Sequence, residues 1–359
     1  MLILILGCVL VLTVLWEAFE TIILPRRVRR RFRLTRVYYR VSWWPFRGAV
    51  GRIHDRRRRD AWLGFFGPLS LLGLLTLWAL ALVVGFGLIH YGAGSHLRIE
   101  GEPAGVGIDL YASGTTFFTL GLGDAAPSTW LARALMVLEA GLGFGFLAIV
   151  IGYLPVIYQA FSRREVFISM LDARAGSPPN AAELLRRHAQ DHTLEQLDAL
   201  LRDWEHWSAE LLESHLSYPV LAYFRSQHDN QSWLGALTTI LDTSALVMAG
   251  FRGRSFTQAR LTFAMARHTV VDLSQVFNTK PNLESEARLS DADLVRLHDA
   301  LRASGLEPDD KDGQRLARLR RLYEPYVMAL AEHLRMELPP WIVTGSQKDN
   351  WQTTAWGGD

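Results

Sequence analysis

The chain has 359 residues, of which 49% are hydrophobic and 21% are charged, and its formal net charge is +2. This length allows two or three domains. Apolar residues are concentrated in residues 1–161, whereas the rest has the composition of a soluble protein, so we expect a membrane part followed by a soluble part. The single cysteine, Cys8, excludes a disulfide framework and a cysteine-based metal site.

Three apolar segments are long enough to cross a membrane. A helix of about 20 residues spans a hydrocarbon core of about 30 Å, and residues 1–24, 62–90 and 130–161 reach this length. The first segment lacks a basic start and a small-residue cleavage site, so we do not interpret it as a signal peptide. We therefore predict three transmembrane helices.

The first of these segments carries two acids, Glu17 and Glu20, one helical turn apart near its inner end. An acid inside a membrane helix is a candidate functional residue. Alternatively, both acids reach the membrane interface and pair with Arg26 or Arg27, because the rise per residue places them near the boundary.

The segment of residues 25–61 is a basic linker with fourteen arginines and no lysine. Basic loops stay on the cytoplasmic side. We therefore expect a protein of the cell (inner) membrane with its N-terminus outside and its C-terminus in the cytoplasm.

Four arginines of this linker follow one another at intervals of three residues: Arg27, Arg30, Arg33 and Arg36. The interval is typical of a voltage-sensor helix, but a sensor needs partner helices, and only one span precedes this segment. We expect the linker to bind anionic lipid headgroups instead. A nucleic-acid partner is not expected, because both ends of the linker are tethered to the membrane.

A glycine-rich turn lies between the second and third apolar segments. Residues 108–118 have the length of a short helix, and Thr119-Leu120-Gly121-Leu122-Gly123-Asp124 follows directly. Glycine reaches positive φ without steric cost, so alternating glycines let successive carbonyls point the same way. No G-K-[ST] motif follows the turn, which argues against a phosphate-binding loop.

This arrangement resembles the pore loop of the potassium channels, whose usual filter reads TVGYGD. The matching residues are Leu110, Tyr111, Ser113, Thr116, Thr119, Gly121, Gly123 and Asp124, and the match continues through Pro127 and Arg133. Residues 62–161 thus resemble the pore module of bacterial potassium channels with one pore loop per chain. The resemblance is specific because non-helical backbone at membrane depth is tolerated only inside protein or along a water-filled path.

Leu122 is a departure from the family, which usually has tyrosine there. The tyrosine hydroxyl braces the filter in the family, and leucine cannot form that hydrogen bond. Some two-pore-domain channels do have a G-L-G filter, so the resemblance still allows selectivity for K⁺.

The resemblance implies an all-α membrane protein with three transmembrane helices, a re-entrant pore helix and a filter, plus an all-helical cytoplasmic domain. The ion-binding groups would be the carbonyls of Thr119, Leu120, Gly121, Leu122 and Gly123 and the Thr119 hydroxyl, which replace the water shell of K⁺. One loop supplies a quarter of the ring, so a homotetramer is expected. K⁺ is the permeant ion, and no catalytic residue or cofactor is expected.

Side chains around the filter are expected to support it: Ser113, Thr115, Thr116, Asp124 and Glu139. Glu139 is unusual because it is an acid within the third span. We expect it to contact Ser113, Thr115 or Thr116 behind the filter; the alternative is an acid that faces water or the lipid interface.

By register with the family, the third span carries the hinge and gate residues Gly143, Phe144, Leu147, Ile151 and Pro155. An apolar lining can close a pore by dewetting, and proline can kink the helix. Alternatively, the large side chains only pack between helices and the glycine only allows close helix contact.

Residues 162–343 show helical periodicity throughout, so we predict an all-helical cytoplasmic domain. Ser290 has the features of a helix start and Gly305 those of a helix end. Absence of a strand pattern argues against a dinucleotide-binding domain and a cyclic-nucleotide barrel. Residues 344–359 are expected to form a polar tail without regular structure.

His188 and His192 lie one helical turn apart, which is compatible with a metal pair, although exposed histidines on a helix are the alternative. Three functions follow from these patterns. The first is a tetrameric potassium-selective channel, the second a non-conducting membrane-anchored sensor or scaffold. The third is a membrane enzyme, for which only Asp191, His192, Glu205 and His206 offer chemistry.

Overall fold

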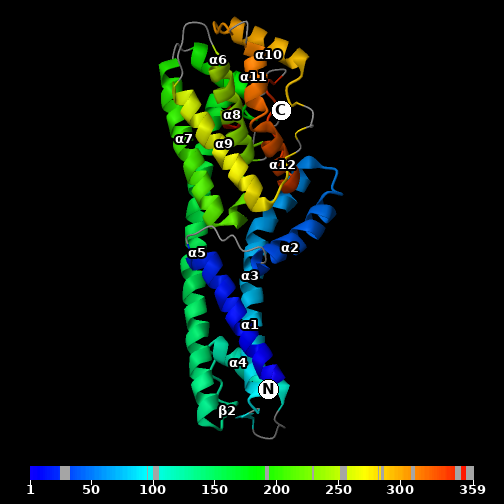
Figure 1. Cartoon of the computed structure of the whole chain (residues 1–359), viewed down its shortest axis with the longest axis vertical. Helices are drawn as coiled ribbons and strands as arrows, with labels where there is room; N and C mark the ends of the chain where they lie inside the picture. The colour runs from blue at the N-terminus through cyan, green and yellow to red at the C-terminus, as the bar shows by residue number, and fades with distance from the viewer. Residues whose placement is uncertain are drawn as a thin grey trace. The chain divides into compact units, whose positions relative to one another are not determined.

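A computed structural model describes residues 1–24, 33–94, 96–99, 105–190, 194–228, 230–250, 257–281, 283, 287–308, 312–343 and 349–352. These residues are mostly helical, and their only strands are the short antiparallel pair β1 (Leu97–Arg98) and β2 (Ala126–Pro127) (Figure 1). The predicted all-α class is confirmed. The chain divides into a first unit, Met1–Arg52 with Phe65–Gln159, and a second unit, Ile53–Gly64 with Ala160–Asp359.

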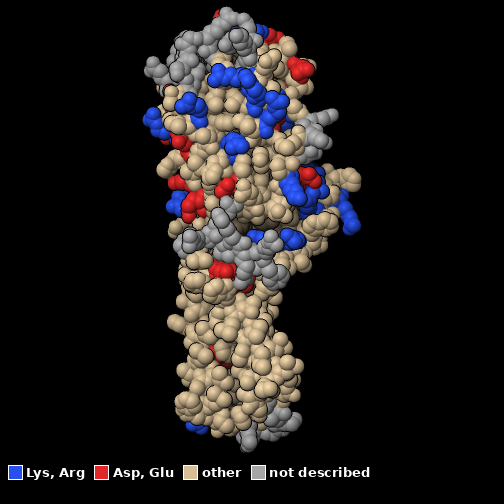
Figure 2. Space-filling model, viewed as in Figure 1, with Lys and Arg blue, Asp and Glu red and all other residues tan. Residues whose placement is uncertain are grey.

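Three helices are long and apolar enough to cross a membrane. The first is α1 (Leu2–Ala18) with the π-helical turn Phe19–Ile23, and the others are α3 (Arg56–Gly92) and α5 (Trp130–Ala175). Figure 2 shows almost no charged side chains over α1, α4 and the first part of α5, and many over α6 to α11. The prediction of three transmembrane helices agrees with these findings.

Both long helices extend beyond the predicted spans. The start of α3 is set by Asp55, whose Oδ1 accepts the backbone N–H of Arg57 at 2.9 Å, because a carboxylate at this position satisfies free amide groups of the first turn. At its other end, α5 runs on to Ala175 and stops where Gly176 takes a φ of +84°. The helix therefore outlasts the apolar segment by several turns.

The contact between α1 and α3 depends on small residues. A Cβ atom added at Gly7 would lie 2.7 Å from the carbonyl oxygen of Gly85, and one added at Gly85 would lie 2.6 Å from a methyl group of Val11. The two helix backbones therefore approach more closely than larger residues would allow, as is typical of helix pairs in membranes.

The acids of the first span have partners that the sequence did not indicate. Buried Glu17 accepts hydrogen bonds from the backbone N–H (3.2 Å) and hydroxyl (3.1 Å) of Thr35. Glu20 accepts from the indole of Trp16 at 2.8 Å and lies 3.9 Å from Arg33. The expected partners Arg26 and Arg27 lie outside the described residues.

Part of the basic linker is the amphipathic helix α2 (Leu34–Val50). One side packs on α3, where the ring of Trp43 lies 4.7 Å from that of Phe66 and the Tyr38 hydroxyl donates to the carbonyl of Ser70 at 2.8 Å. Another side leaves four apolar side chains exposed: Leu34, Val37, Val41 and Trp44. The spacing of three, four and three residues places them on a single helix face.

The second unit is a helical domain built around α8 (Trp233–Ala249), whose side chains are almost all buried. The surrounding elements are α6 (Ala181–Gln190), α7 (Leu194–Ser217), the 3₁₀ turn Pro219–Tyr223, α9 (Thr257–Phe277), α10 (Asp291–Ala303), α11 (Asp312–Arg320), α12 (Glu324–Leu334) and the 3₁₀ turn Asn350–Gln352 (Figure 1). The predicted start of α10 is confirmed, because the Ser290 hydroxyl accepts the N–H of Asp293 at 3.1 Å. Gly305 follows its end with a φ of +80°.

Charged side chains also hold this domain together. Asp242, buried on α8, accepts from Arg288 at 2.8 Å and from the Tyr323 hydroxyl at 2.5 Å. The guanidinium groups of Arg288 and Arg320 lie 5.7 and 5.4 Å from the ring of Trp341. A buried carboxylate needs such partners, because an unpaired charge in the interior is costly.

Candidate functional site

The candidate site begins with helix α4 (Val106–Phe117), which leads directly into the glycine-rich turn. The pairing of β1 with β2, Leu97 opposite Pro127, closes this loop on itself. A small core of Leu97, Ile108, Ala112 and Ala132 packs α4 against the strand and the start of α5. The turn is thus held between two fixed points.

The backbone of the turn alternates in conformation. Thr119, Gly121 and Gly123 have φ values of 56°, 58° and 80°, and neither Leu120 nor Leu122 has a positive φ. A positive φ is uncommon for a residue with a side chain, so Thr119 is held there by its surroundings. Alternation of this kind turns successive carbonyl groups to the same side of the chain.

Two hydrogen bonds fix the turn to the end of α4. The N–H of Leu120 donates to the carbonyl of Thr115 at 2.8 Å, and that of Thr119 donates to the carbonyl of Thr116 at 3.0 Å. Beyond them the segment from Thr119 to Gly123 is exposed, with Leu120 at 61% and Leu122 at 62% of their full surface. A single chain therefore presents the turn without enclosing it.

Asp124 at the end of the turn is tied back to α4. Its Oδ2 accepts the Tyr111 hydroxyl at 2.7 Å, and its Oδ1 accepts the N–H of Ala125 at 2.9 Å. The Tyr111 hydrogen bond favours the ionised carboxyl and lowers the pKa of Asp124 below its ordinary value. No pattern in the sequence indicated this contact.

Behind the turn, Ser113 of α4 joins the two long helices. Its hydroxyl donates to the carbonyl of Val83 on α3 at 2.7 Å and also contacts Oε1 of Glu139 on α5. Glu139 is fully buried and its other oxygen lies 3.6 Å from Nε2 of His90. Of the three expected partners, Glu139 therefore contacts Ser113, while the Thr115 hydroxyl donates to the carbonyl of Ala112.

Comparison with known proteins adds the family. Residues 76–159, which include α4, the turn and parts of α3 and α5, match the family model described as an ion channel. This stretch is an ion-channel domain. The resemblance inferred from the pore loop is thereby confirmed.

The chain is also 23% identical over 238 residues to the uncharacterized membrane protein YdjJ of Bacillus subtilis (strain 168), a match that covers 66% of this chain and 68% of that relative. No solved structure matches the chain. Together with the three apolar helices, these similarities identify a membrane protein that contains an ion-channel domain.

Helix α5, which follows the turn, stays helical through the expected hinge and gate positions. Gly143 touches the end of α4: a Cβ atom there would overlap the carbonyl oxygen of Phe117. Three further residues, Phe144, Leu147 and Ile151, are exposed. Their spacing of three and four residues puts them on one face. Pro155 lies inside the helix without ending it.

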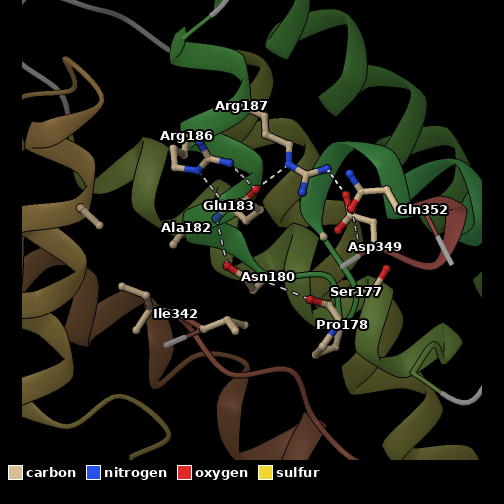
Figure 3. A pocket seen from close by; sticks show the side chains of 13 residues that line it. Ser177, Pro178, Asn180, Ala182, Glu183, Arg186, Arg187, Ile342, Asp349 and Gln352 are labelled. Atoms are coloured by element: carbon tan, nitrogen blue, oxygen red, sulfur yellow. Dashed lines mark hydrogen bonds and ion pairs between the residues drawn. The ribbon is translucent and has the colours of Figure 1, made fainter. Parts of the chain in front are cut away.

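Outside the ion-channel domain, the second unit contains a cavity of about 480 Å³ (Figure 3). Its wall includes Glu183, which accepts hydrogen bonds from Arg186 (2.7 Å) and Arg187 (2.6 Å), and Asp349, which pairs with Arg187 at 2.9 Å. The two cations and two anions thus neutralise one another within the wall.

The candidate residues of the metal pair and of the membrane enzyme are not brought together in the part of the chain that the structure describes. His188 contacts the carbonyl of Leu184 at 2.8 Å, and Glu205 accepts from Gln258 at 2.6 Å. His206 is exposed beside Glu210. Asp191 and His192 lie outside the described residues, and the described ones contain no cluster that could hold a metal.

Proposed function

We propose that four copies of this chain form a potassium-selective channel in the cell membrane. The carbonyls of Thr119 to Gly123, with the Thr119 hydroxyl, would replace the water shell of K⁺ at stacked sites. The observation that carries this proposal is the alternating backbone, with positive φ at every second residue from Thr119 to Gly123. In a membrane, such a ladder can offer its oxygen atoms to a cation.

The tetramer is part of this proposal. Non-helical backbone is tolerated at membrane depth only inside protein or along water, yet the segment from Thr119 to Gly123 is exposed in one chain. Assembly about a fourfold axis would enclose the turn, close the ring of oxygens and place the exposed Phe144, Leu147 and Ile151 of α5 along the central path.

Orientation and lipid contacts complete the proposal. Basic segments remain on the cytoplasmic side, so the arginines that precede α3 put the second unit in the cytoplasm and α4 near the outer surface. The helical second unit would then assemble or gate the channel from inside. We place α2 at the inner membrane interface, with its arginines on anionic headgroups.

Cation flux in liposomes tests the proposal. Wild-type protein should pass K⁺ and Rb⁺ and largely exclude Na⁺ under a K⁺ gradient. Gly121→Ala should abolish flux, because alanine is strained at a φ of 58° and adds a methyl group where four chains meet. Leu122→Tyr should keep the flux, since it restores a hydroxyl that can stiffen the filter.

The matched control is Gly107→Ala, the same chemical change in α4 at a position where an added Cβ atom has no neighbour within 4 Å. It should conduct like the wild type. Equal fluxes of Na⁺ and K⁺ would remove the selectivity claim. No flux under any stimulus would favour the non-conducting sensor.

A further inference from the structure

His90 is a buried histidine at the outer end of α3 whose polar neighbour is an acid. Only 2% of His90 is exposed, and Glu139 on α5 and Ser113 on α4 are exposed by 0% and 1%. The three side chains come from the three helices of the ion-channel domain. They form one series of contacts. His90 Nε2 lies 3.6 Å from Glu139 Oε2, and the Ser113 hydroxyl contacts Glu139 Oε1.

The two facing atoms have no alternative within the described residues. Neither Nε2 of His90 nor Oε2 of Glu139 forms a hydrogen bond, although buried polar atoms nearly always have a partner, and the 3.6 Å between them is within reach of an ion pair. A gap of 3.6 Å leaves no room for a bridging water. At this distance an imidazolium attracts a carboxylate without a direct hydrogen bond.

The series of contacts continues from Glu139 through α4 to the glycine-rich turn. Ser113 has one hydroxyl proton and two oxygen neighbours, the carboxyl of Glu139 and the carbonyl of Val83. The position of the Glu139 carboxyl therefore determines how Ser113 is held between α3 and α5. Because Ser113 is part of α4, this position also affects α4. Two residues further along α4, the carbonyl of Thr115 accepts the N–H of Leu120 in the turn.

We propose that His90 is a positioning residue for the filter: it fixes the carboxyl of Glu139, which through Ser113 fixes the end of α4 that carries the turn. The inference rests on the proposed function as a selective channel. It gives α3, the helix that carries His90, a role in selectivity although α3 contributes no residue to the turn.

The test is the Na⁺ to K⁺ permeability ratio of the full chain in liposomes. His90→Leu removes the polar group that faces Oε2 of Glu139, so this buried oxygen then meets only apolar atoms and the ratio should rise about fivefold to tenfold. His90→Gln keeps a polar atom at the same place and should restore most of the selectivity. A residue that only fills space would be replaced better by leucine than by glutamine.

Three further variants sharpen this test. Glu139→Leu should raise the ratio as well, and the double variant His90→Leu with Glu139→Leu should be no worse than Glu139→Leu alone, because the two residues act through one contact. The control Ile89→Leu changes a buried neighbour on α3 that packs near Gly7 instead, and it should keep the wild-type ratio. A wild-type ratio in His90→Leu, or additive effects in the double variant, would overturn the proposal.

A second readout separates this inference from the channel proposal. Thermal unfolding of the detergent-solubilised protein gives the coupling between His90 and Glu139 without any flux. If wild-type liposomes pass no cation, the proposed function fails, and the positioning role fails with it. The unfolding measurements can show that His90 and Glu139 are coupled while His90→Leu still conducts selectively. That result would overturn the positioning role alone.

Discussion

His215 in the second unit shows how burial fixes the charge of a single residue. It is fully buried on α7, its Nδ1 contacts the carbonyl of Leu211 at 2.9 Å, and its ring lies 5.1 Å from that of Trp233. The guanidinium of Arg164 lies 3.4 Å from its Nε2. Burial and this neighbouring cation both disfavour the imidazolium, so the pKa of His215 falls well below its ordinary value of 6.5.

The sign of the resulting pH dependence follows directly. Below about pH 6.5 the unfolded chain binds a proton at this residue and the folded protein does not, so stability falls as the pH falls through that window. The loss reaches at most about 1.4 kcal/mol per pH unit. His215→Gln should therefore flatten the change in thermal midpoint between pH 7.5 and 5.5.

Tryptophan fluorescence of the solubilised protein can follow this unfolding. The matched control is His206→Gln, because the side chain of His206 is 77% exposed and should leave the pH dependence as it is in the wild type. If His215→Gln loses as much stability on acidification as the wild type, another group is responsible.

For single residues, the sequence predicted the local backbone conformation of the turn. It did not predict which side chains of different helices contact one another. The glycines of TLGLGD were recognisable because their spacing reflects a local conformation. The contact of Glu139 with Ser113 was one of three that helix register allowed. His90, Tyr111 and Arg164 were not assigned to any contact, because nothing in an apolar or amphipathic run tells which polar side chain will meet which partner on another helix.

Among the elements, helix α2 combines two kinds of surface. Its exposed apolar side chains, Leu34, Val37, Val41 and Trp44, lie on one face, and Arg36 and Arg40 are also exposed. A helix with such a surface lies in the plane of a membrane interface. Arg33 lies 3.9 Å from Glu20 and donates to Thr21 at 3.1 Å.

We predict that replacing Arg36 and Arg40 by glutamine weakens the dependence of K⁺ flux on anionic lipid. Each arginine near a charged surface contributes about 1 kcal/mol, so the stimulation by phosphatidylglycerol should drop several-fold. Flux in liposomes with and without this lipid measures it, with Arg302→Gln on α10 as the control. A large loss of gating charge with an intact lipid response would show that the segment senses voltage instead.

The end of the chain forms an element that the sequence did not predict. We expected residues 344–359 to lack regular structure, but the described part, Asp349 to Gln352, contains the 3₁₀ turn Asn350–Gln352, which is docked on the end of α5. Asp172 receives hydrogen bonds from Asn350 (3.1 Å) and from the backbone of Trp351 (3.4 Å), and also from Gln231 at 3.3 Å. The expectation was wrong for this part because polar residues were taken as solvated, while their partners lie about 180 positions earlier.

Loss of the Asp172 carboxylate should release this turn. In Asp172→Ala the amide hydrogens of a peptide that includes Asp349 to Gln352 should exchange several times faster, because exchange follows local opening. Hydrogen exchange with mass spectrometry of the full chain measures it. Asp299→Ala, which removes an exposed acid beside Arg302, is the control and should leave the peptide protected. Identical exchange in all three proteins would show that Asp172 does not hold the turn.

For the molecule as a whole, we predict an assembly of four chains, because each chain has a single glycine-rich turn. One chain supplies one turn of exposed carbonyls, and a closed ring needs several equivalent copies related by a rotation axis. The mass of the detergent-solubilised protein should therefore correspond to four chains, each of 40.5 kDa. A monomer or dimer as the only species would exclude the pore arrangement.

The general organisation was readable from the sequence because it depends on sums over many residues. Apolar length predicted three spanning helices, and helical periodicity predicted the helical second unit. How far a helix continues past its apolar part was not readable, since Asp55 and Gly176 set the ends of α3 and α5 through capping and backbone geometry. The ion-channel resemblance rested on ten matching residues, and the family match covers residues 76–159.

The close approach at Gly143 has a mechanical consequence. No side chain lies between the backbone of α5 at Gly143 and the carbonyl of Phe117, the last residue of α4. Two backbones in direct contact have no flexible atoms to absorb a displacement, unlike side chains that can change rotamer. Any bend or rotation of α5 at this level must therefore displace the carbonyl end of α4 and the turn bonded to it. In a channel built this way, a movement of α5 would also change the geometry of the turn, so opening at the helix and conduction at the turn would be coupled.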